Sequence, residues 1–134
     1  MVMLDLQKAF DTVDHYILLM KLKCMGLNYV AVNWLRSYLT NRTQVCNVGD
    51  VLSEAKEISC GVPQGSNLGP LLILIYVNDM PDKARVCTLL YADDSAILVS
   101  AKDTVYIEET LSKELHFVRD WLTDNKLSLH LGKT

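Results

Sequence analysis

Three aspartates stand where their carboxylates could bind divalent cations. Asp93 and Asp94 lie between two apolar runs, at a turn where Asn-Gly would be the easy choice, and Asp5 ends the first apolar run. Taken alone, an Asp-Asp pair is also typical of a solvated acidic turn. Sheets, however, commonly bring a first strand beside a central hairpin, and carboxylates that meet there repel one another unless their pKa values rise or cations bind. Oxygen ligands favour Mg²⁺ or Mn²⁺ over zinc, and two such ions support in-line phosphoryl or nucleotidyl transfer.

Hydrophobic periodicity predicts the elements that would position these aspartates. Strands are expected up to about residue 6 and over residues 43–48, 56–60, 86–91, 96–99 and 127–131. Helices are expected over residues 15–24, 30–39, 68–76 and 104–126, the third of them buried on nearly every side. Residues 61–65 are expected to form a loop, because Pro63 lacks the N–H that a strand needs and two glycines weaken any regular element.

The order of these elements predicts an α+β fold, with an antiparallel sheet and helices packed on one of its faces. No internal repeat and no linker divides the 134 residues, so one compact unit is expected, cut from something larger. Asp11 is expected to cap the helix that follows it, and His15 to begin that helix rather than act as a base. Trp34 and Trp121 fall on helical patterns, which favours core packing over base stacking.

Composition narrows the class of protein and its compartment. The formal net charge is −3, whereas a small domain that wraps nucleic acid by itself is usually basic. The four cysteines form no metal-binding or disulfide pattern, which favours reduced thiols inside the cell, with nucleus and cytoplasm not distinguished. The longest apolar run, residues 71–77, is far shorter than the roughly 20 residues that span a bilayer, and no signal peptide opens the chain, so no membrane partner is expected.

Three segments in order resemble the motifs of a known enzyme family. Residues 4–15 (LDLQKAFDTVDH), 61–66 (GVPQGS) and 91–94 (YADD) are similar to motifs A, B and C of reverse transcriptases, in wording closest to those of non-LTR (LINE-type) retrotransposons. The similarity runs from Leu4 to Thr134. The resemblance implies a polymerase palm, with an antiparallel sheet that carries the catalytic carboxylates.

The resemblance also implies a set of metal ligands. Asp5 and Asp93 would be the main ligands of two Mg²⁺ or Mn²⁺ ions, with Asp94 as the third carboxylate and the Leu6 carbonyl as a further ligand. These ions would activate the primer 3′-hydroxyl and neutralise the departing pyrophosphate. Asp5, Asp93 and Asp94 would therefore be catalytic.

Other positions would bind the substrate by the same resemblance. Phe10 would be the steric gate that excludes a ribose 2′-hydroxyl, and the N–H groups of Lys8 and Ala9 would lie near the triphosphate. Gln64, held between Pro63 and Gly65, would touch the incoming nucleotide and the template. Tyr91 would support the primer end.

The last ten residues, 125–134, resemble motif D. There Lys133 would be the catalytic lysine that protonates pyrophosphate, although a penultimate lysine is equally typical of a solvated charge. Two positions depart from the family pattern: His130 stands where Asn is usual, and Asn67 where an apolar residue is usual. The end of the chain also mimics a phosphate-binding loop, but Leu127 replaces the glycine that such a loop requires.

The predicted function is therefore RNA-directed DNA polymerase activity, the two-metal transfer of deoxynucleotides to a primer 3′-hydroxyl. The partners implied are an RNA template, a DNA primer, deoxynucleoside triphosphates, and fingers and thumb segments of a longer polyprotein. Neither fingers nor thumb fits in residues 1–134, so the chain is expected to be a partial palm that is incomplete as a standalone enzyme. The alternatives are an inactive transposon-derived remnant that acts as an interaction module, and an RNA-binding domain, which would want aromatics on its central strands.

Overall fold

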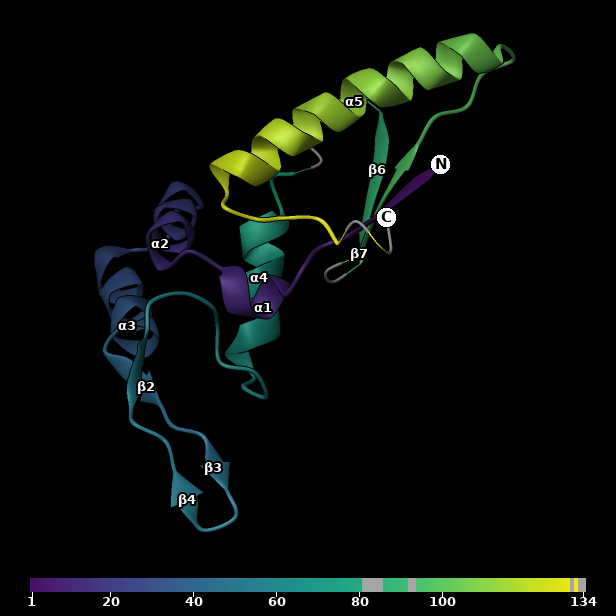
Figure 1. The fold of residues 1–134 in the computed structure, drawn as a ribbon. Helices are drawn as coiled ribbons and strands as arrows, with labels where there is room; N and C mark the ends of the chain where they lie inside the picture. Colours follow the sequence, from purple (N-terminus) through teal and green to yellow (C-terminus); the bar gives the residue numbers. More distant parts are fainter. Residues whose placement is uncertain (81–85, 92–93, 131, 133–134) are drawn as a thin grey trace.

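A computed structural model describes residues 1–80, 86–91, 94–130 and 132 of the chain (Figure 1). The helices are α1 (Ala9–Thr12), α2 (His15–Cys24), α3 (Tyr29–Leu39), α4 (Leu68–Val77) and α5 (Thr104–Asp124). The strands are β1 (Val2–Asp5), β2 (Arg42–Gln44), β3 (Asn47–Val48), β4 (Val51–Leu52), β5 (Lys56–Ile58), β6 (Cys87–Tyr91) and β7 (Asp94–Leu98). The four longer helices and the β6–β7 pair confirm the pattern expected from the sequence.

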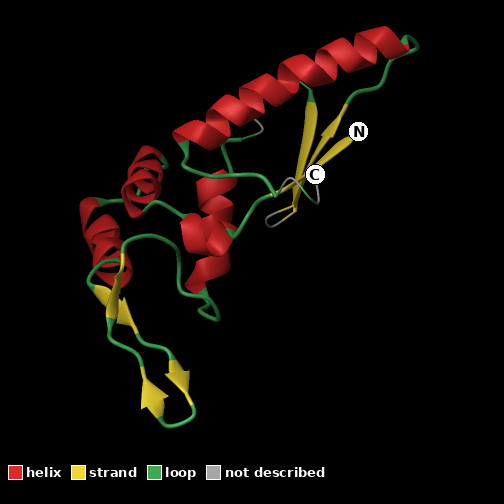
Figure 2. Ribbon diagram, in the orientation of Figure 1, coloured by secondary structure: helices red, strands yellow, loops and turns green. Residues whose placement is uncertain are grey.

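Every described strand pair is antiparallel. The main sheet has the order β1-β7-β6, and the pairs β2–β5 and β3–β4 are separate two-stranded ladders. Figure 2 shows these two pairs as an arm that projects from the helices. The mixture of helices with antiparallel strands agrees with the predicted α+β class.

Two strand predictions need correction. The strand expected over residues 43–48 divides into β2 and β3, because Cys46 leaves the first ladder and pairs with Ser53 across the arm. The strand expected over residues 127–131 is wrong in its described part, where Leu129 forms only an isolated bridge with Leu6. The bridge lies just beyond the end of β1, and its backbone bonds are Gln7 N to Ser128 O and His130 N to Asp5 O, each 2.8 Å.

The main sheet has one buried and one open face. Leu4 and Ile97 are 2% and 0% exposed, and both belong to the hydrophobic core. Met3 and Leu89, which alternate with the buried positions, are 48% and 56% exposed. Side chains alternate between the faces of a strand, so this pattern assigns every residue of β1, β6 and β7 to one face or the other.

Residues of α2, α3, α4 and α5 share one core with the buried face of the sheet. Tyr76 of α4 is fully buried at its centre, which matches the expected burial of this helix. However, Leu71 and Leu74 on the other side of α4 are exposed, so the expectation that α4 is buried on nearly every side is wrong. The reason is that no described element covers that side of the helix.

The two tryptophans behave differently. Trp121 is buried in the core, as expected, whereas Trp34 is 58% exposed. The core side of α3 is formed by Val32, Leu35 and Leu39, and Trp34 lies outside that stripe. Its ring stacks instead on Tyr38, one turn further along the helix, with the ring centroids 6.0 Å apart.

Candidate active site

Two of the predicted catalytic carboxylates lie opposite each other in the main sheet. Asp5 ends β1 and Asp94 begins β7, and the antiparallel register pairs these two residues directly. Directly opposite residues of an antiparallel pair have Cβ atoms about 4.5–5.5 Å apart. The same register pairs Tyr91 of β6 with Asp94, so the three form a row across the sheet. The row lies on the same open face as Met3 and Leu89, because it is two residues away from them along each strand.

Asp93 and Lys133, the two other residues predicted to be catalytic, lie outside the described residues, so their roles remain predictions. Among the described residues there is no group of three or more His, Cys, Asp or Glu side chains arranged to bind a metal ion. The described part of the site thus offers the two carboxylates of Asp5 and Asp94. Their oxygen chemistry fits Mg²⁺ or Mn²⁺ and suits zinc poorly.

The turn after β1 brings the next set of predicted residues beside the carboxylates. Leu6 is buried and bridges to Leu129, and Lys8 takes a left-handed conformation with φ of 50° immediately before α1. Ala9, the first residue of α1, is buried. The N–H groups at the start of a helix lack partners within the helix, so the N–H groups of Lys8 and Ala9 are not used by the hydrogen bonds of α1.

Phe10 and Tyr91 line the same cavity. This cavity has a volume of about 380 Å³ and an almost entirely apolar lining, completed by Pro70, Ile73, Leu74 and Leu90. It lies between α1, α4 and β6, next to the row that contains Asp94. The structure therefore brings the predicted steric gate and the predicted primer-end tyrosine together, although they are 81 positions apart in the chain.

The glycine-rich loop is tied to α1 and the turn after it by backbone bonds. Gly61 N donates to Val13 O and Val62 N donates to Phe10 O, both at 2.7 Å. A Cβ on Gly61, which has φ of +85°, would lie 2.9 Å from the carbonyl oxygens of Phe10 and Asp11. This glycine is therefore required both for its backbone conformation and for the close approach of the two segments.

His15 adds a side-chain tie to the same contact. It is buried as the first residue of α2, and its Nε2 lies 2.7 Å from Gly61 O. This placement agrees with the expectation that His15 begins a helix rather than acting as a base.

The loop ends by capping α4. The Ser66 hydroxyl accepts a bond from Gly69 N at 3.0 Å and donates to Pro63 O at 2.7 Å. Asn67 makes no side-chain capping bond and is exposed, so this departure from the family pattern leaves the cap intact. A Cβ on Gly69 would lie 2.8 Å from Pro63 O, which explains why the second residue of α4 is a glycine.

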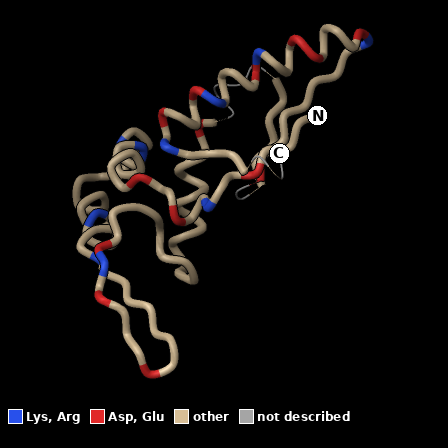
Figure 3. The backbone as a smooth tube through the Cα atoms, viewed as in Figure 1, with Lys and Arg blue, Asp and Glu red and all other residues tan. Residues whose placement is uncertain are grey.

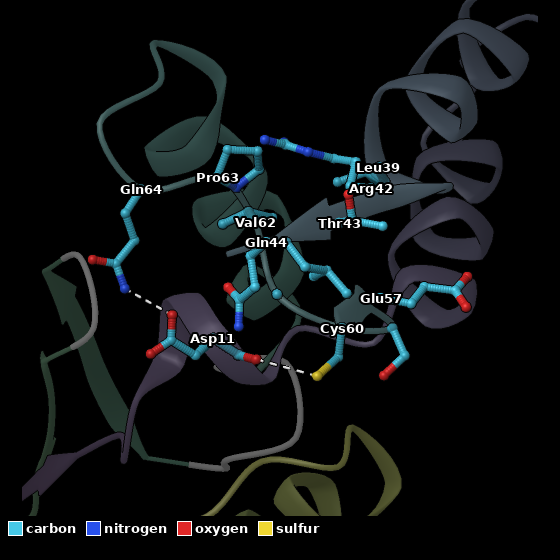
Figure 4. A pocket seen from close by; sticks show the side chains of 13 residues that line it. Asp11, Leu39, Arg42, Thr43, Gln44, Glu57, Cys60, Val62, Pro63 and Gln64 are labelled. Atoms are coloured by element: carbon cyan, nitrogen blue, oxygen red, sulfur yellow. Dashed lines mark hydrogen bonds between the residues drawn. The ribbon is translucent and has the colours of Figure 1, made fainter. Parts of the chain in front are cut away.

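Gln64 and Asp11 face a second, larger cavity. Gln64 Nε2 donates to Asp11 Oδ1 at 2.7 Å, and both side chains line a space of about 700 Å³ between the loop and β2–β5 (Figure 4). Gly65, which follows, has φ of +75°. Asp11 therefore does not cap the next helix, because its carboxylate is directed to Gln64. The cap of α2 is Asp14, whose side chain accepts from Ile17 N.

Asp14 is a residue whose role the sequence did not suggest. Its carboxylate also accepts a bond from Lys126 Nζ at 2.6 Å, and its backbone pairs with Cys60. Burial acts to raise the pKa of Asp14, but the bond from Lys126 and the N–H of Ile17 outweigh it, so the pKa lies below the ordinary 3.8. Asp14 directly precedes the helix expected from residue 15, and an Asp at that position is a usable capping signal. Nothing in the local sequence indicates the contact with Lys126.

In Figure 3, Lys and Arg are spread along the helices and loops among Asp and Glu. No helix among the described residues is long and apolar enough to cross a membrane.

The paired carboxylates and the glycine-rich loop bring together parts of the three segments that resemble motifs A, B and C of reverse transcriptases. A family model described as "Reverse transcriptase (RNA-dependent DNA polymerase)" matches residues 1–134, and the chain belongs to this family.

Three curated relatives illustrate the similarity. The RNA-directed DNA polymerase from mobile element jockey of Drosophila melanogaster is 37% identical over 140 residues, which cover 97% of this chain and 15% of that protein. The probable RNA-directed DNA polymerase from transposon X-element of the same species is 40% identical, covering 70% of this chain and 11% of that protein. The Pol polyprotein from type-1 retrotransposable element R1 of Bradysia coprophila is 28% identical, covering 98% of this chain and 13% of that protein.

These matches confirm the resemblance to non-LTR retrotransposon polymerases. The chain spans only about 15% of the length of the first of these relatives.

Proposed function

We propose that the chain is the palm region of an RNA-directed DNA polymerase, which transfers deoxynucleotides to a primer 3′-hydroxyl on an RNA template. The observation that carries this proposal is the register pair of Asp5 and Asp94 on the open sheet face. Like charges directly opposite each other destabilise a sheet, so a pair that stabilised only the fold would not be expected there. Family membership supports the same reaction.

In this proposal two Mg²⁺ or Mn²⁺ ions, when bound, supply the charge that activates the 3′-hydroxyl and stabilises the leaving pyrophosphate. Asp5 and Asp94 provide carboxylate oxygens, Leu6 provides its carbonyl oxygen, and Asp93 is proposed as a further ligand. Lys133 is proposed as the proton donor to pyrophosphate.

The substrate roles follow the same arrangement. Phe10 presents its ring beside the apolar cavity that it shares with Tyr91, and so can exclude a 2′-hydroxyl while Tyr91 supports the primer end. The N–H groups of Lys8 and Ala9 are proposed to face the triphosphate, and Gln64 with Gly65 to contact the nucleotide and the template.

We further propose that β1-β7-β6, with its core-facing side on the helices, is the palm sheet. Duplex nucleic acid is held mainly through phosphate contacts, and the described Lys and Arg positions are spread along the backbone among Asp and Glu (Figure 3). The fingers and thumb that grip the template and primer would then come from other segments of a longer polyprotein.

Primer extension tests the proposal. Incorporation of deoxynucleotides on an RNA template with Mg²⁺ or Mn²⁺ is compared for this chain, for the longest reading frame that contains it, and for Asp5→Asn in each. Asp50→Asn is the matched control, because Asp50 is an exposed carboxylate at the turn of β3–β4. Incorporation that Asp5→Asn abolishes and Asp50→Asn retains is the expected result.

The same experiment separates the alternatives. Activity of the short chain would exclude an inactive remnant, and activity of the longer frame alone would identify a palm that needs its neighbours. Incorporation that persists in Asp5→Asn, or none in any form, would refute the proposed function.

A further inference from the structure

Residues 60–62 of the loop that carries Gln64 are bonded to the segment from Phe10 to Asp14, and the side chain of Gln64 adds a bond to Asp11. Cys60, Gly61 and Val62 contact the segment from Phe10 to Asp14 through backbone bonds and a bridge. Cys60 Sγ also donates to Asp11 O at 3.3 Å. Beyond this stretch the loop turns away through Gly65, whose φ is +75°. Gln64 is therefore the residue at which the fixed part of the loop ends.

The chemistry of Asp11 decides which way the Gln64 amide faces. An ionised carboxylate has only acceptor atoms, whereas an amide has a donor end and an acceptor end. The amide must therefore turn its Nε2 to Asp11, which is the observed bond of 2.7 Å. Figure 4 shows the other end of the amide, Oε1, turned away from Asp11.

We propose that Asp11 is a positioning residue, which holds the Gln64 side chain so that Oε1 is presented as a hydrogen-bond acceptor to the nucleotide. The proposal rests on the proposed polymerase function and deepens it. It specifies the chemistry of the group that Gln64 contacts: that group must be a donor, such as a sugar hydroxyl or a base N–H. Without Asp11 the amide can rotate about its terminal torsion and present either end.

The separation of the two residues makes this contact a link between motifs. Asp11 and Gln64 are 53 positions apart, and the segment of Asp11 follows directly from Asp5 in the chain. Residues 5–11 thus carry a proposed metal ligand at one end and the support of a proposed nucleotide contact at the other.

A double-mutant cycle tests the proposal, with Asp11→Ala, Gln64→Ala and both changes made in the longest reading frame that contains this chain. Asp11→Ala is expected to raise KM for the deoxynucleotide by about threefold to tenfold with a smaller change in kcat, the loss typical of one neutral hydrogen bond between Gln64 and the nucleotide. In the Gln64→Ala background, Asp11→Ala is expected to add nothing. Asp11→Asn, which keeps an acceptor oxygen, is expected to restore most of the affinity.

Asp50→Ala is the matched control, because it removes an equal charge from an exposed turn and is expected to leave KM unchanged. A second measurement is independent of activity: the side-chain amide resonances of Gln64, assigned by their loss in Gln64→Ala, are expected to shift in Asp11→Ala and to remain near their original positions in Asp50→Ala.

Each outcome either supports or overturns the positioning role of Asp11. The positioning role would be overturned if the Gln64 amide resonances did not respond to Asp11→Ala, or if the effects of the two substitutions on KM simply added. In that case, metal-dependent activity that needs Asp5 would still support the proposed function. Absence of incorporation by every form would refute the proposed function, and the positioning role with it.

Discussion

At the scale of single residues, Gly61 is the point where the glycine-rich loop comes closest to α1. Its φ of +85° is disfavoured for other residues, and an added Cβ would meet two backbone oxygens at 2.9 Å. One of these oxygens, that of Phe10, accepts the bond from Val62 N, so it cannot move aside without breaking the contact.

Gly61→Ala is therefore expected to lower the free energy of unfolding by about 2–4 kcal/mol, from backbone strain and steric overlap together. Urea unfolding measures the loss. Gly26→Ala is the control, because Gly26 has φ of +91° with nothing within 4 Å of the added Cβ, so only strain of about 1–2 kcal/mol is expected. Equal losses in the two variants would mean that the close approach carries no cost.

The paired carboxylates make a second prediction at this scale. Asp5→Asn is expected to raise the melting temperature slightly without metal, because it removes a like charge opposite Asp94, and to remove any stabilisation by Mn²⁺. A cation at ten times its Kd stabilises by about 1.4 kcal/mol, or roughly 5 °C in Tm for a chain of this size.

Thermal melting with and without millimolar Mn²⁺ measures both effects, and Asp50→Asn provides the control. A wild-type chain whose melting temperature does not respond to Mn²⁺ would argue against a formed metal site in the chain alone.

At the scale of elements, Tyr76 joins α4 to the segment after α5. It is fully buried, and its hydroxyl donates to Asn125 O at 2.7 Å. Burial raises the pKa of Tyr76 to about 12, so the hydroxyl stays neutral across the physiological range. The pKa of Tyr76 is higher in the folded than in the unfolded chain, so the neutral hydroxyl contributes stability to the fold. This contribution is complete below pH 10 and declines as the pH rises toward 12.

Tyr76→Phe keeps the ring but leaves the Asn125 carbonyl without this donor, at an expected cost of about 1–2 kcal/mol. Chemical denaturation at pH 7 measures it. Tyr106→Phe, which removes a hydroxyl from an exposed position of α5, is expected to change stability little. A loss of similar size in both variants would contradict the role given to the buried bond.

The bond between Asp14 and Lys126 connects the start of α2 to the residues that follow α5. Asp14→Asn retains an N-cap side chain while removing the charge that pairs with Lys126 and that the N–H groups of α2 stabilise. The pKa of Asp14 is lowered in the folded chain, so its ionised form contributes stability above pH 3.8 that is lost as the pH falls below that value.

Asp14→Asn is therefore expected to be less stable than the wild type at pH 7. The expected difference in the free energy of unfolding is less than about 1 kcal/mol, because Lys126 is largely exposed. Near pH 3 the two free energies of unfolding are expected to become similar. Urea titrations at both pH values measure the difference, and Asp120→Asn on α5 serves as the control. A stability difference that stays constant with pH would exclude the ion pair as its cause.

At the scale of the whole molecule, apolar side chains are exposed on two described surfaces. Met3 and Leu89 lie on the open sheet face, and Leu71 and Leu74 lie on the uncovered side of α4. Exposed apolar patches of this kind mark surfaces that bind a partner or promote association.

The chain alone is therefore expected to self-associate as its concentration rises, and Leu71→Lys with Leu89→Lys is expected to reduce the association. Sedimentation velocity over a range of concentrations measures it. Ser112→Lys is the control, because Ser112 is an exposed polar residue of α5. A chain that remains monomeric would show that these surfaces do not associate.

Local sequence determined much of the molecule. The limits of α2, α3, α4 and α5 follow within about two residues from hydrophobic periodicity, because a helix is stabilised by contacts between neighbours in the chain. The segments that resemble motifs A, B and C identified the family that the comparison confirms. The failed strand over residues 127–131 shows the limit of this reasoning, since an alternating pattern forms a ladder only where a partner strand continues alongside it.

Tertiary structure alone decided which side chains meet. The sequence placed Asp5 and Asp94 at the ends of strands, but the register that sets them opposite each other depends on a pairing of segments about 90 residues apart. The tertiary structure also directs the Asp11 side chain to Gln64 rather than to the next helix. It pairs Asp14 with Lys126, which lies 112 positions away in the chain. Such contacts have no local signal, because they arise from the packing of whole elements around a common core.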